Sequence, residues 1–308
     1  MMMPFLLCLY LSPPTFDPGK VSFELVYRDE VSPYSVQSAF VLPNEPLDLT
    51  LRHQGGATFK LHAPTLTVSQ VKEQQWQLSA PPEPGRHEAV IHREDTGEQV
   101  RLNVFVMEPF AKVKNGMLHG YRIGTYPDKP LNNNPIYLPP RGFVKVTKDD
   151  LDVKVSPHFT LGRFLCKQKS DFPKYLVLRP RLLRKLEYLL EEVNRQGLAC
   201  SSFYIMSAFR TPYYNHAIGN VRYSRHQWGG AVDFYIDEKP KDGYPDDLNG
   251  DGTIDHHDSM VLYRLIDNLS QRRDYRAFVG GLGRYRKTAA HGPFVHVDVR
   301  GFKARWGE

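Results

Sequence analysis

The stretch SRHQWGGAVDFY, from Ser224 to Tyr235, sets one histidine and one aspartate seven residues apart, with a Gly-Gly pair between them. The residues after the glycines read as a mostly apolar strand that carries Asp233 in its interior. Because burying an unpaired carboxylate costs several kcal/mol, this aspartate either faces solvent or has a positive partner. A metal ion shared with His226 is the sharpest candidate for that partner.

A catalytic zinc site needs three protein ligands, usually His nitrogens, carboxylate oxygens or Cys sulfurs. The Gly229-Gly230 pair frees the backbone to fold His226 back toward the strand. A third ligand should come from a neighbouring strand. FVHVDVRG (residues 294–301) supplies His296, which alternates with Asp298 on one face. A histidine inside a strand is more often an ordinary core residue, and the spacing alone leaves both interpretations open.

Three segments carry a more specific pattern. SAFRTPYYNHAIGN (residues 207–220) places an arginine just after a strand, and Ser224 to Asp233 meets every fixed position of Ser-x-His-x-x-Gly-x-Ala-x-Asp. A strand histidine follows in FVHVDVRG. Together with SPHFTLGRFLCK (residues 156–167), these segments resemble the zinc D-alanyl-D-alanine carboxypeptidase family, which includes related murein endopeptidases. The resemblance covers residues 155–301, about half of the chain.

The resemblance implies a zinc ion held by His226, Asp233 and His296. Such a site acidifies a water molecule and polarises an amide carbonyl. Arg210 matches the family's substrate-holding arginine, because a guanidinium pairs well with a carboxylate. The substrate site implied in this way also contains Ser207 and Ser224.

The chain departs from the family where a general base is expected. The usual acid three residues before the last ligand is Pro293 here, which can neither accept nor donate a proton. His291 is the candidate that replaces it, because an imidazole of near-neutral pKa can shuttle protons. Asp298 is expected to accept a hydrogen bond from a ligand imidazole and so to orient it.

A second metal site is predicted in DLNGDGTIDHHD (residues 247–258). The stretch fits the calcium-loop pattern D-x-[DN]-x-[DN]-G, with acids at positions nine and twelve. Gly252 supplies the turn, and an exit helix is expected from Ser259. The predicted ligands of a structural Ca²⁺ are Asp247, Asn249, Asp251, the Thr253 carbonyl, Asp255 and Asp258. The alternative is an acidic surface turn.

The rest of the chain predicts two domains. Residues 21–110 contain short alternating runs separated by turns, which is typical of an all-β immunoglobulin-like sandwich. Residues 111–150 are rich in Gly, Pro and Asn and read as a linker, or as an extended segment lying on the next domain. Residues 151–308 mix helices and strands and predict an α+β zinc peptidase domain with a small antiparallel sheet.

Individual elements are also expected in the C-terminal half. Leucine spacing predicts a helix within residues 180–197, and a second helix is expected at 260–269. Strands are expected at 202–206, 278–281 and 294–299.

The chain of 308 residues has a net charge of +6, which weakly favours an anionic partner such as a cell-wall polymer and does not require nucleic acid. No apolar run is long enough to span a membrane. Residues 1–20 read as an incomplete signal segment, because no basic residue precedes the apolar core. Three cysteines form no disulfide framework, although Cys166 and Cys200 could either pair or stay free.

The expected function is therefore a zinc-dependent peptidase of the periplasm or cell envelope. It would hydrolyse D-amino-acid-containing amide bonds in peptidoglycan stem peptides, either as a D-Ala-D-Ala carboxypeptidase or as a murein endopeptidase. The alternative is a non-catalytic wall-binding module stabilised by zinc and calcium, which the missing acid at position 293 favours.

Overall fold

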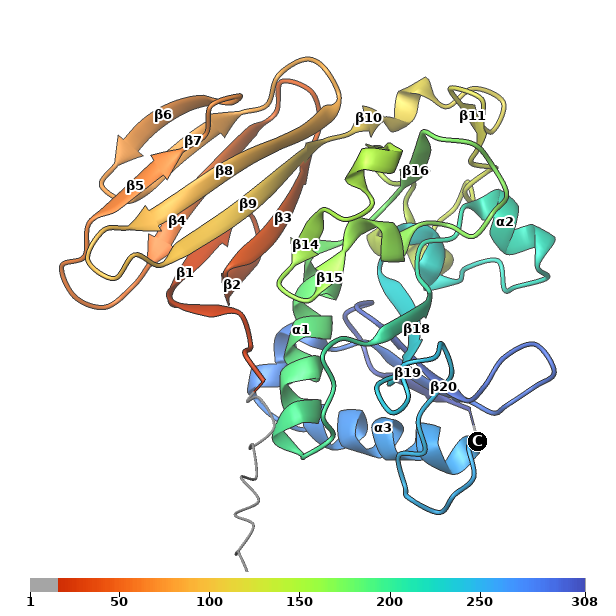
Figure 1. Cartoon of the computed structure of the whole chain (residues 1–308). Coiled ribbons are helices and arrows are strands. Elements are labelled where there is room, and N and C mark those ends of the chain that lie inside the picture. Colours follow the sequence, from red (N-terminus) through yellow and green to blue (C-terminus); the bar gives the residue numbers. More distant parts are fainter. Residues whose placement is uncertain (1–15, 308) are drawn as a thin grey trace, which may run out of the picture.

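The computed structural model describes residues 16–307 and is rich in β-structure, as expected (Figure 1). Its N-terminal part consists of two sheets that face each other. The first has the order β2-β1-β4-β7-β6. Its strands are β1 (Lys20–Tyr27), β2 (Glu30–Tyr34), β4 (Pro46–Arg52), β6 (Thr67–Lys72) and β7 (Gln75–Ser79). The second has the order β3-β9-β8-β5. Its strands are β3 (Val36–Val41), β5 (Phe59–His62), β8 (Gly85–Arg93) and β9 (Gln99–Val106).

Strand alternation explains the core between these sheets. In β4, Leu47, Leu49 and Leu51 are buried, whereas Asp48 between them is exposed. The leucines pack in one hydrophobic cluster with residues of the opposite sheet, among them Ile91. The two sheets therefore form a sandwich around one apolar layer.

A long irregular segment follows the sandwich and contains short strands and 3₁₀ turns. Its strands are β10 (Glu108–Pro109), β11 (Met117–Leu118), β12 (Tyr121–Arg122), β13 (Gly142–Val146), β14 (Lys154–Ser156), β15 (Phe159–Thr160) and β16 (Lys174–Leu176). Its 3₁₀ turns are η1 (Phe110–Lys112), η2 (Leu131–Asn133), η3 (Pro135–Tyr137), η4 (Lys148–Asp150) and η5 (Leu161–Phe164).

Residues 111–150 lie on the C-terminal part and are not a free linker. Tyr121, Tyr126 and Tyr137 are buried in the same hydrophobic cluster as the C-terminal helices and strands. The Tyr126 hydroxyl donates to the Gln227 carbonyl at 2.8 Å, and the indole of Trp228 donates to the Leu138 carbonyl at 2.9 Å. Of the two arrangements expected from the sequence, the chain adopts the packed one.

The C-terminal part is built on a five-stranded sheet with the order β17-β18-β20-β19-β21, antiparallel except for the pair β19–β21. The strands are β17 (Tyr204–Ser207), β18 (Ala231–Tyr235), β19 (Gly281–Tyr285), β20 (Phe294–Asp298) and β21 (Ala304–Trp306). The helices are α1 (Pro180–Arg195), α2 (Pro212–Ala217) and α3 (His256–Leu269), with the 3₁₀ turns η6 (Arg225–Trp228) and η7 (Asp274–Phe278).

Helices α1 and α3 cover one side of this sheet (Figure 1). In β18, Val232 and Phe234 join the core that these helices share, as Val295 and Val297 do in β20. Because side chains alternate along a strand, the residues between them face the other way. Asp233 and His296 therefore point to the opposite side of the sheet.

Two predicted elements differ from the structure. Helix α3 begins at His256 rather than near residue 259, because Asp255 caps it and forms a capping box with Asp258. The strand predicted at 278–281 is wrong. Phe278 ends η7 with its ring buried, and the strand starts only at Gly281, since apolarity alone does not separate a buried turn from a strand.

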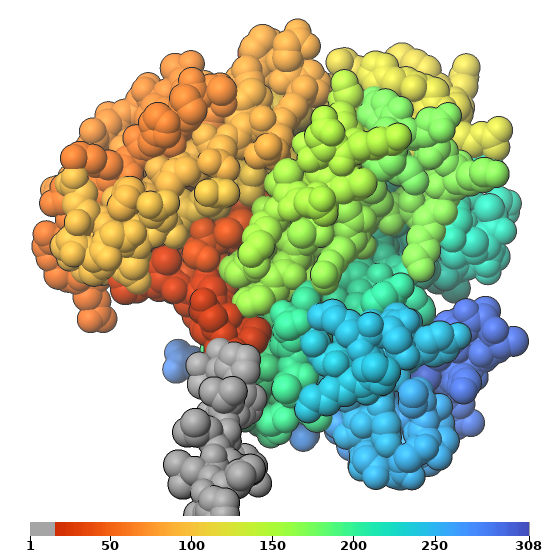
Figure 2. Space-filling view, viewed as in Figure 1, coloured from red at the N-terminus to blue at the C-terminus, as the bar shows by residue number. Residues whose placement is uncertain are grey.

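The sandwich contributes side chains to the core of the C-terminal part. Phe40 of β3 and Phe105 of β9 belong to the C-terminal hydrophobic cluster. The Ser38 hydroxyl donates to the Val155 carbonyl at 2.9 Å, and the Asn103 amide donates to the Lys154 carbonyl at 3.0 Å. In the space-filling view the sandwich abuts this segment without a gap (Figure 2).

Cys166 and Cys200 are buried free thiols. Cys8 and most of the expected signal segment lie outside the described residues. None of the described helices combines the length and the apolar character needed to cross a membrane.

Candidate metal centre

One row of residues crosses the whole C-terminal sheet. In adjacent strands, Ser207 pairs with Asp233, Asp233 with His296, His296 with Gly283, and Gly283 with Trp306. Directly paired residues point to the same face with their Cβ atoms about 5 Å apart. The sheet register therefore brings an aspartate and a histidine from distant parts of the chain into contact.

His226 reaches this row from the 3₁₀ turn η6. Gly229 ends the turn with a left-handed φ of 60°, and a Cβ at this position would lie 2.1 Å from the Val177 carbonyl oxygen. Only glycine fits such a backbone position. The next residues enter β18, so the Gly-Gly pair folds His226 back over Asp233, as the sequence pattern predicted.

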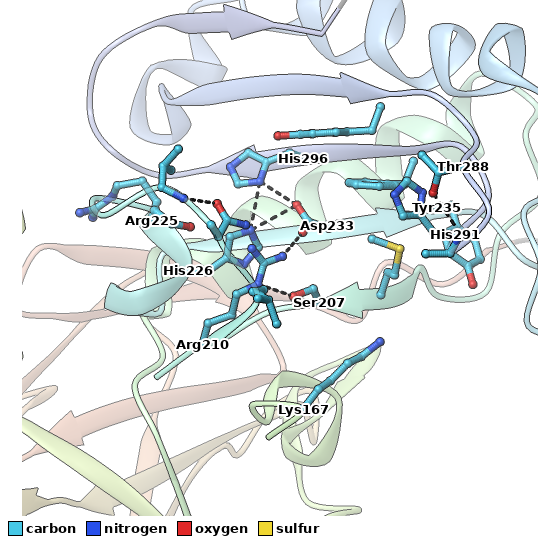
Figure 3. Close-up of a pocket in the computed structure, with 18 of the residues that line it drawn as sticks. Lys167, Ser207, Arg210, Arg225, His226, Asp233, Tyr235, Thr288, His291 and His296 are labelled. Atoms are coloured by element: carbon cyan, nitrogen blue, oxygen red, sulfur yellow. Dashed lines mark hydrogen bonds and ion pairs between the residues drawn. The ribbon is translucent and has the colours of Figure 1, made fainter. Parts of the chain in front are cut away.

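Three ligand atoms meet at this point, from His226, Asp233 and His296 (Figure 3). His226 Nε2 lies 3.2 Å from Asp233 Oδ1 and 3.2 Å from His296 Nδ1, and His296 Nδ1 lies 2.8 Å from Asp233 Oδ1. All three residues are buried. The structure thus brings together the full set of predicted zinc ligands.

Neighbouring acceptors fix which nitrogen of each imidazole faces the cluster. His226 Nδ1 donates to the Ala208 carbonyl at 2.6 Å, which leaves the Nε2 lone pair toward the cluster. His296 Nε2 donates to Asp298 Oδ2 at 3.3 Å, which directs Nδ1 inward. Asp298 thus occupies the orienting position expected for it.

The protonation of the cluster follows from burial and from these contacts. Burial lowers the pKa of His226. Burial opposes ionisation of Asp233, yet His226 and His296 hold the pKa of its carboxyl well below the usual value. Burial also acts against charging His296, but hydrogen bonds to Asp233 and Asp298 raise its pKa above the usual value. The low pKa of Asp233 therefore keeps a negative charge between the two imidazoles.

The donor set fits zinc. Ligands at 2.0–2.1 Å in a tetrahedron lie about 3.3 Å from one another, and the three contacts of the cluster are close to that spacing. Two imidazoles and one carboxylate are a common set for catalytic zinc, which keeps a fourth position open.

Arg210 holds the carboxylate of Asp233 in place. Its Nη2 donates to Asp233 Oδ2 at 2.5 Å, and its Nε donates to the Ser207 hydroxyl at 2.9 Å. The guanidinium is largely buried and is engaged inside the protein, so it orients a candidate ligand. Arg210 also lines the cavity, and the substrate-holding role that the resemblance implied stays a prediction.

Trp306 forms one wall of the centre, and the sequence did not indicate it. Its ring centroid lies 5.0 Å from that of His296, and its Nε1 donates to the Tyr285 hydroxyl at 2.9 Å. A Cβ at Gly283 would lie 2.4 Å from the indole, so glycine is required where the ring crosses β19. No local spacing reveals this contact, because β21 joins the sheet from the end of the chain.

The centre opens into a cavity of about 1530 Å³. Its lining contains six basic side chains, which are Lys167, Arg210, Arg222, Arg225, Lys287 and Arg300. Asp233 is the single carboxylate residue among the described lining residues. The cavity therefore favours an anionic ligand.

His291 and Ser224 also line this cavity but do not join the cluster. Figure 3 shows His291 well apart from His296 and Asp233, beside Thr288 and Tyr235. His291 Nδ1 lies 2.8 Å from the Gly292 carbonyl. The predicted proton carrier is thus in the cavity without contacting the candidate metal ligands.

The predicted calcium loop wraps around its own carboxylates. Asp247 accepts the backbone N–H groups of Gly250 and Gly252, each at 2.8 Å. Asp258 accepts the Leu248 N–H at 2.8 Å, and Asn249 donates to Asp251 Oδ2 at 2.8 Å. Thr253 lies in the exposed part of the loop.

A second group of three ligand atoms within 4.8 Å of one another lies within this loop, from Asp255, His256 and His257. It overlaps the predicted calcium set at Asp255 alone. These side chains are more exposed than the zinc cluster, and Asp255 serves as the cap of α3.

Lys185 supports the centre from behind. This buried side chain of α1 donates to the carbonyl oxygens of Phe278 and Asp298 at 3.0 and 2.8 Å. Burial is the main cause that lowers its pKa to about 7. The Asp298 carboxylate also accepts the Gly281 N–H at 2.9 Å and pairs with Arg300.

Neither a family model nor a curated protein matches the sequence. Three solved structures are similar to parts of the chain. An endo-fucoidan hydrolase of glycoside hydrolase family 107 is 12% identical over 27% of this chain and 14% of its own, with a TM-score of 0.22. The adhesin InvE of Yersinia pseudotuberculosis is 18% identical over 30% and 29%, with a TM-score of 0.20. Domains 4 and 5 of the S-layer protein SbsC are 15% identical over 26% and 53%, with a TM-score of 0.17. The chain spans about half or less of these structures, and TM-scores this low do not establish a shared fold.

Proposed function

We propose that the C-terminal part is a zinc-dependent peptidase that hydrolyses D-amino-acid-containing amide bonds in peptidoglycan stem peptides. The action would be that of a D-Ala-D-Ala carboxypeptidase or of a murein endopeptidase. The observation that carries the proposal is the convergence of His226, Asp233 and His296 on one point beside an open cavity. The Ser-x-His-x-x-Gly-x-Ala-x-Asp pattern adds support, since its glycine makes that convergence sterically possible.

Three contacts of the protein prepare the centre. The Ala208 carbonyl and Asp298 fix the tautomers of the two imidazoles. Arg210 fixes the carboxylate of Asp233. Zinc bound there would lower the pKa of a water molecule and polarise the scissile carbonyl. Because these contacts exist beforehand, little reorganisation is needed when the metal binds.

The charge of the cavity agrees with the proposed substrate class. Stem peptides of peptidoglycan carry free carboxylates, and the lining has six basic side chains against one acidic residue. A cleft lined with one sign of charge concentrates ligands of the opposite sign.

Proton transfer is proposed for His291, the histidine that lines the cavity on the loop between β19 and β20. Its position apart from the cluster requires movement of this loop or an intervening water molecule. The absence of a second lining carboxylate among the described residues favours a second candidate function. In that function the same centre binds a wall peptide without cutting it.

The remaining assignments follow from this function. A structural Ca²⁺ in the loop of residues 247–258 would hold the start of α3. The sandwich would serve as an immunoglobulin-like spacer or binding module. With peptidoglycan as its partner, the protein would act in the periplasm or cell envelope.

The test is incubation of the zinc-loaded full chain with purified muropeptides, followed by mass spectrometry of the products. Loss of a terminal D-alanine identifies a carboxypeptidase, and separation of cross-linked peptides identifies an endopeptidase. His226→Ala serves as the control, because it should abolish both products. Binding of muropeptides without any product would favour the non-catalytic module.

A further inference from the structure

Arg225 has an unusual environment for a charged side chain. It precedes His226 in η6, lines the cavity, and is only 2% exposed. Its Nη1 donates to the Ile136 carbonyl at 3.0 Å, whereas Nε and Nη2 have no partner in the part of the chain that the structure describes. A buried guanidinium with free donors is costly unless a ligand satisfies them.

Aromatic rings hold this guanidinium without neutralising it. Its Cζ lies 4.8 Å from the ring centre of Tyr137 and 5.4 Å from that of Trp228. These contacts account for the burial of the charge but give no hydrogen-bond acceptor to Nε and Nη2.

Arg300 adds a second positive charge to the lining of the same cavity. Its Nε and Nη2 donate to the Asp298 carboxylate at 2.9 and 2.5 Å. That single carboxylate also accepts from His296, so no acidic side chain is left for Arg225. The positive charge here exceeds the negative charge that the protein supplies.

We propose that Arg225, together with Arg300, forms a subsite for a carboxylate of the substrate beside the His226–Asp233–His296 cluster. The inference rests on the proposed function and deepens it by naming a specificity-determining residue. A guanidinium presents two parallel N–H groups that match a carboxylate. Figure 3 shows Arg225 and His291 on opposite sides of the cluster. A bound peptide would therefore place its acidic group toward Arg225 and its remainder toward His291.

Two carboxylates of a stem peptide could supply this group, namely the C-terminal one and the α-carboxylate of the γ-linked D-glutamate. Three forms of the peptide L-Ala-γ-D-Glu-L-Lys-D-Ala-D-Ala separate them: the free acid, the C-terminal amide, and the form with D-isoglutamine. Binding is measured by calorimetry with the full chain freed of metal by a chelator, so that no peptide is cut.

The wild-type protein should bind the free acid at least about tenfold more tightly than one of the two amidated forms, since a bidentate charged pair contributes that much or more. The weakened form identifies the carboxylate that Arg225 holds. Arg225→Met should remove the discrimination, keep the zinc-binding capacity, and change the melting temperature little, because the methionine still packs between the two rings. Arg273→Gln removes an exposed charge outside the cavity and should keep the discrimination.

Equal binding of all three peptides by the wild type would overturn the inference, and so would discrimination retained in Arg225→Met. If the methionine variant does not fold, Arg225→Lys keeps the charge but not the planar fork. In Arg225→Lys the ratio of affinities between the free acid and the amidated peptide should fall several-fold. A ratio equal to that of the wild type would count against the subsite. Failure of the proposed function is recognised separately. If the protein discriminates between the peptides through Arg225 but the zinc-loaded form cuts none of them, the subsite stands and the peptidase proposal fails. If the protein cuts all three peptides and binds them equally, the peptidase proposal stands and the subsite fails.

Discussion

Asp233 and His296 are directly opposite each other on neighbouring antiparallel strands, with Oδ1 and Nδ1 2.8 Å apart. A slip of either strand by one residue would turn its ligand into the core and bring a valine to the cavity. The hydrophobic side of the sheet, with Val232 and Val297, opposes such a slip. The packing of the core thus also fixes the geometry of the candidate metal centre.

Zinc binding should depend on all three side chains of the cluster. We expect one tightly bound zinc per chain in the wild type and none in His226→Ala, because two remaining ligands do not hold the ion. Elemental analysis after purification without chelators measures the number of zinc ions per chain. His62→Ala, which changes an exposed histidine of β5, should keep the metal. Wild-type protein without zinc, even after dialysis against the ion, would exclude the zinc centre.

Asp298→Asn should weaken zinc binding by roughly ten- to a hundredfold, because the amide no longer holds the His296 imidazole as a carboxylate does. Competition with a chromophoric chelator gives the affinity. Asp267→Asn is a matched control, since Asp267 pairs with Arg305 away from the cavity. An unchanged affinity in Asp298→Asn would mean that the imidazole is oriented by other contacts.

His291→Ala should keep zinc and lose most of the peptidase activity, about a hundredfold if His291 carries the proton. The rate of muropeptide cleavage is compared with that of His216→Ala, an exposed histidine of α2. A wild-type rate in His291→Ala would assign proton transfer to another group.

The candidate ligands could be predicted because three short segments resemble a known family, whereas spacing alone left both interpretations open. Residues 224–233 contain the turn, the glycine and the strand, and alternation places His296 on the correct face. Trp306 and Lys185 could not be predicted, since their contacts depend on strand order and on helix packing. The Arg210–Asp233 pair could not be predicted for the same reason, because spacing does not show which carboxylate an arginine meets in the fold.

Calcium should raise the melting temperature of the wild-type protein, because an ion that binds only the folded loop stabilises it by mass action. Scanning calorimetry with calcium and with a selective chelator measures the shift. In Asp251→Ala the two temperatures should coincide, since the loop loses one of its predicted ligands. If the wild type shows no shift either, residues 247–258 are an acidic turn.

Lys185 should make stability depend on pH in the alkaline range. Burial is the main cause that lowers the pKa of this lysine to about 7, against 10.5 in its ordinary state, while Asp298 raises it and Arg305 and Arg300 lower it. Above pH 7 the folded state releases this proton and the unfolded state keeps it until about pH 10. The contribution of Lys185 to the free energy of unfolding therefore rises between pH 7 and about pH 10, by on the order of 4 kcal/mol.

Urea unfolding of the wild type and of Lys185→Met at several pH values measures this contribution. The difference between the two free energies should change by several kcal/mol from pH 7 to pH 10. Lys145→Met, at an exposed position of β13, should follow the wild type. A constant difference for Lys185→Met would show that the lysine stays charged in the folded protein.

Phe40 and Phe105 belong to the sandwich by connectivity and to the C-terminal cluster by packing. Loss of the sandwich would expose apolar surface on the segment that precedes α1, and loss of the C-terminal part would expose these two rings to water. We therefore expect each half to be less stable alone than in the full chain. Thermal unfolding should be a single cooperative transition, in which an ion bound near α3 also protects the distant sandwich from proteolysis.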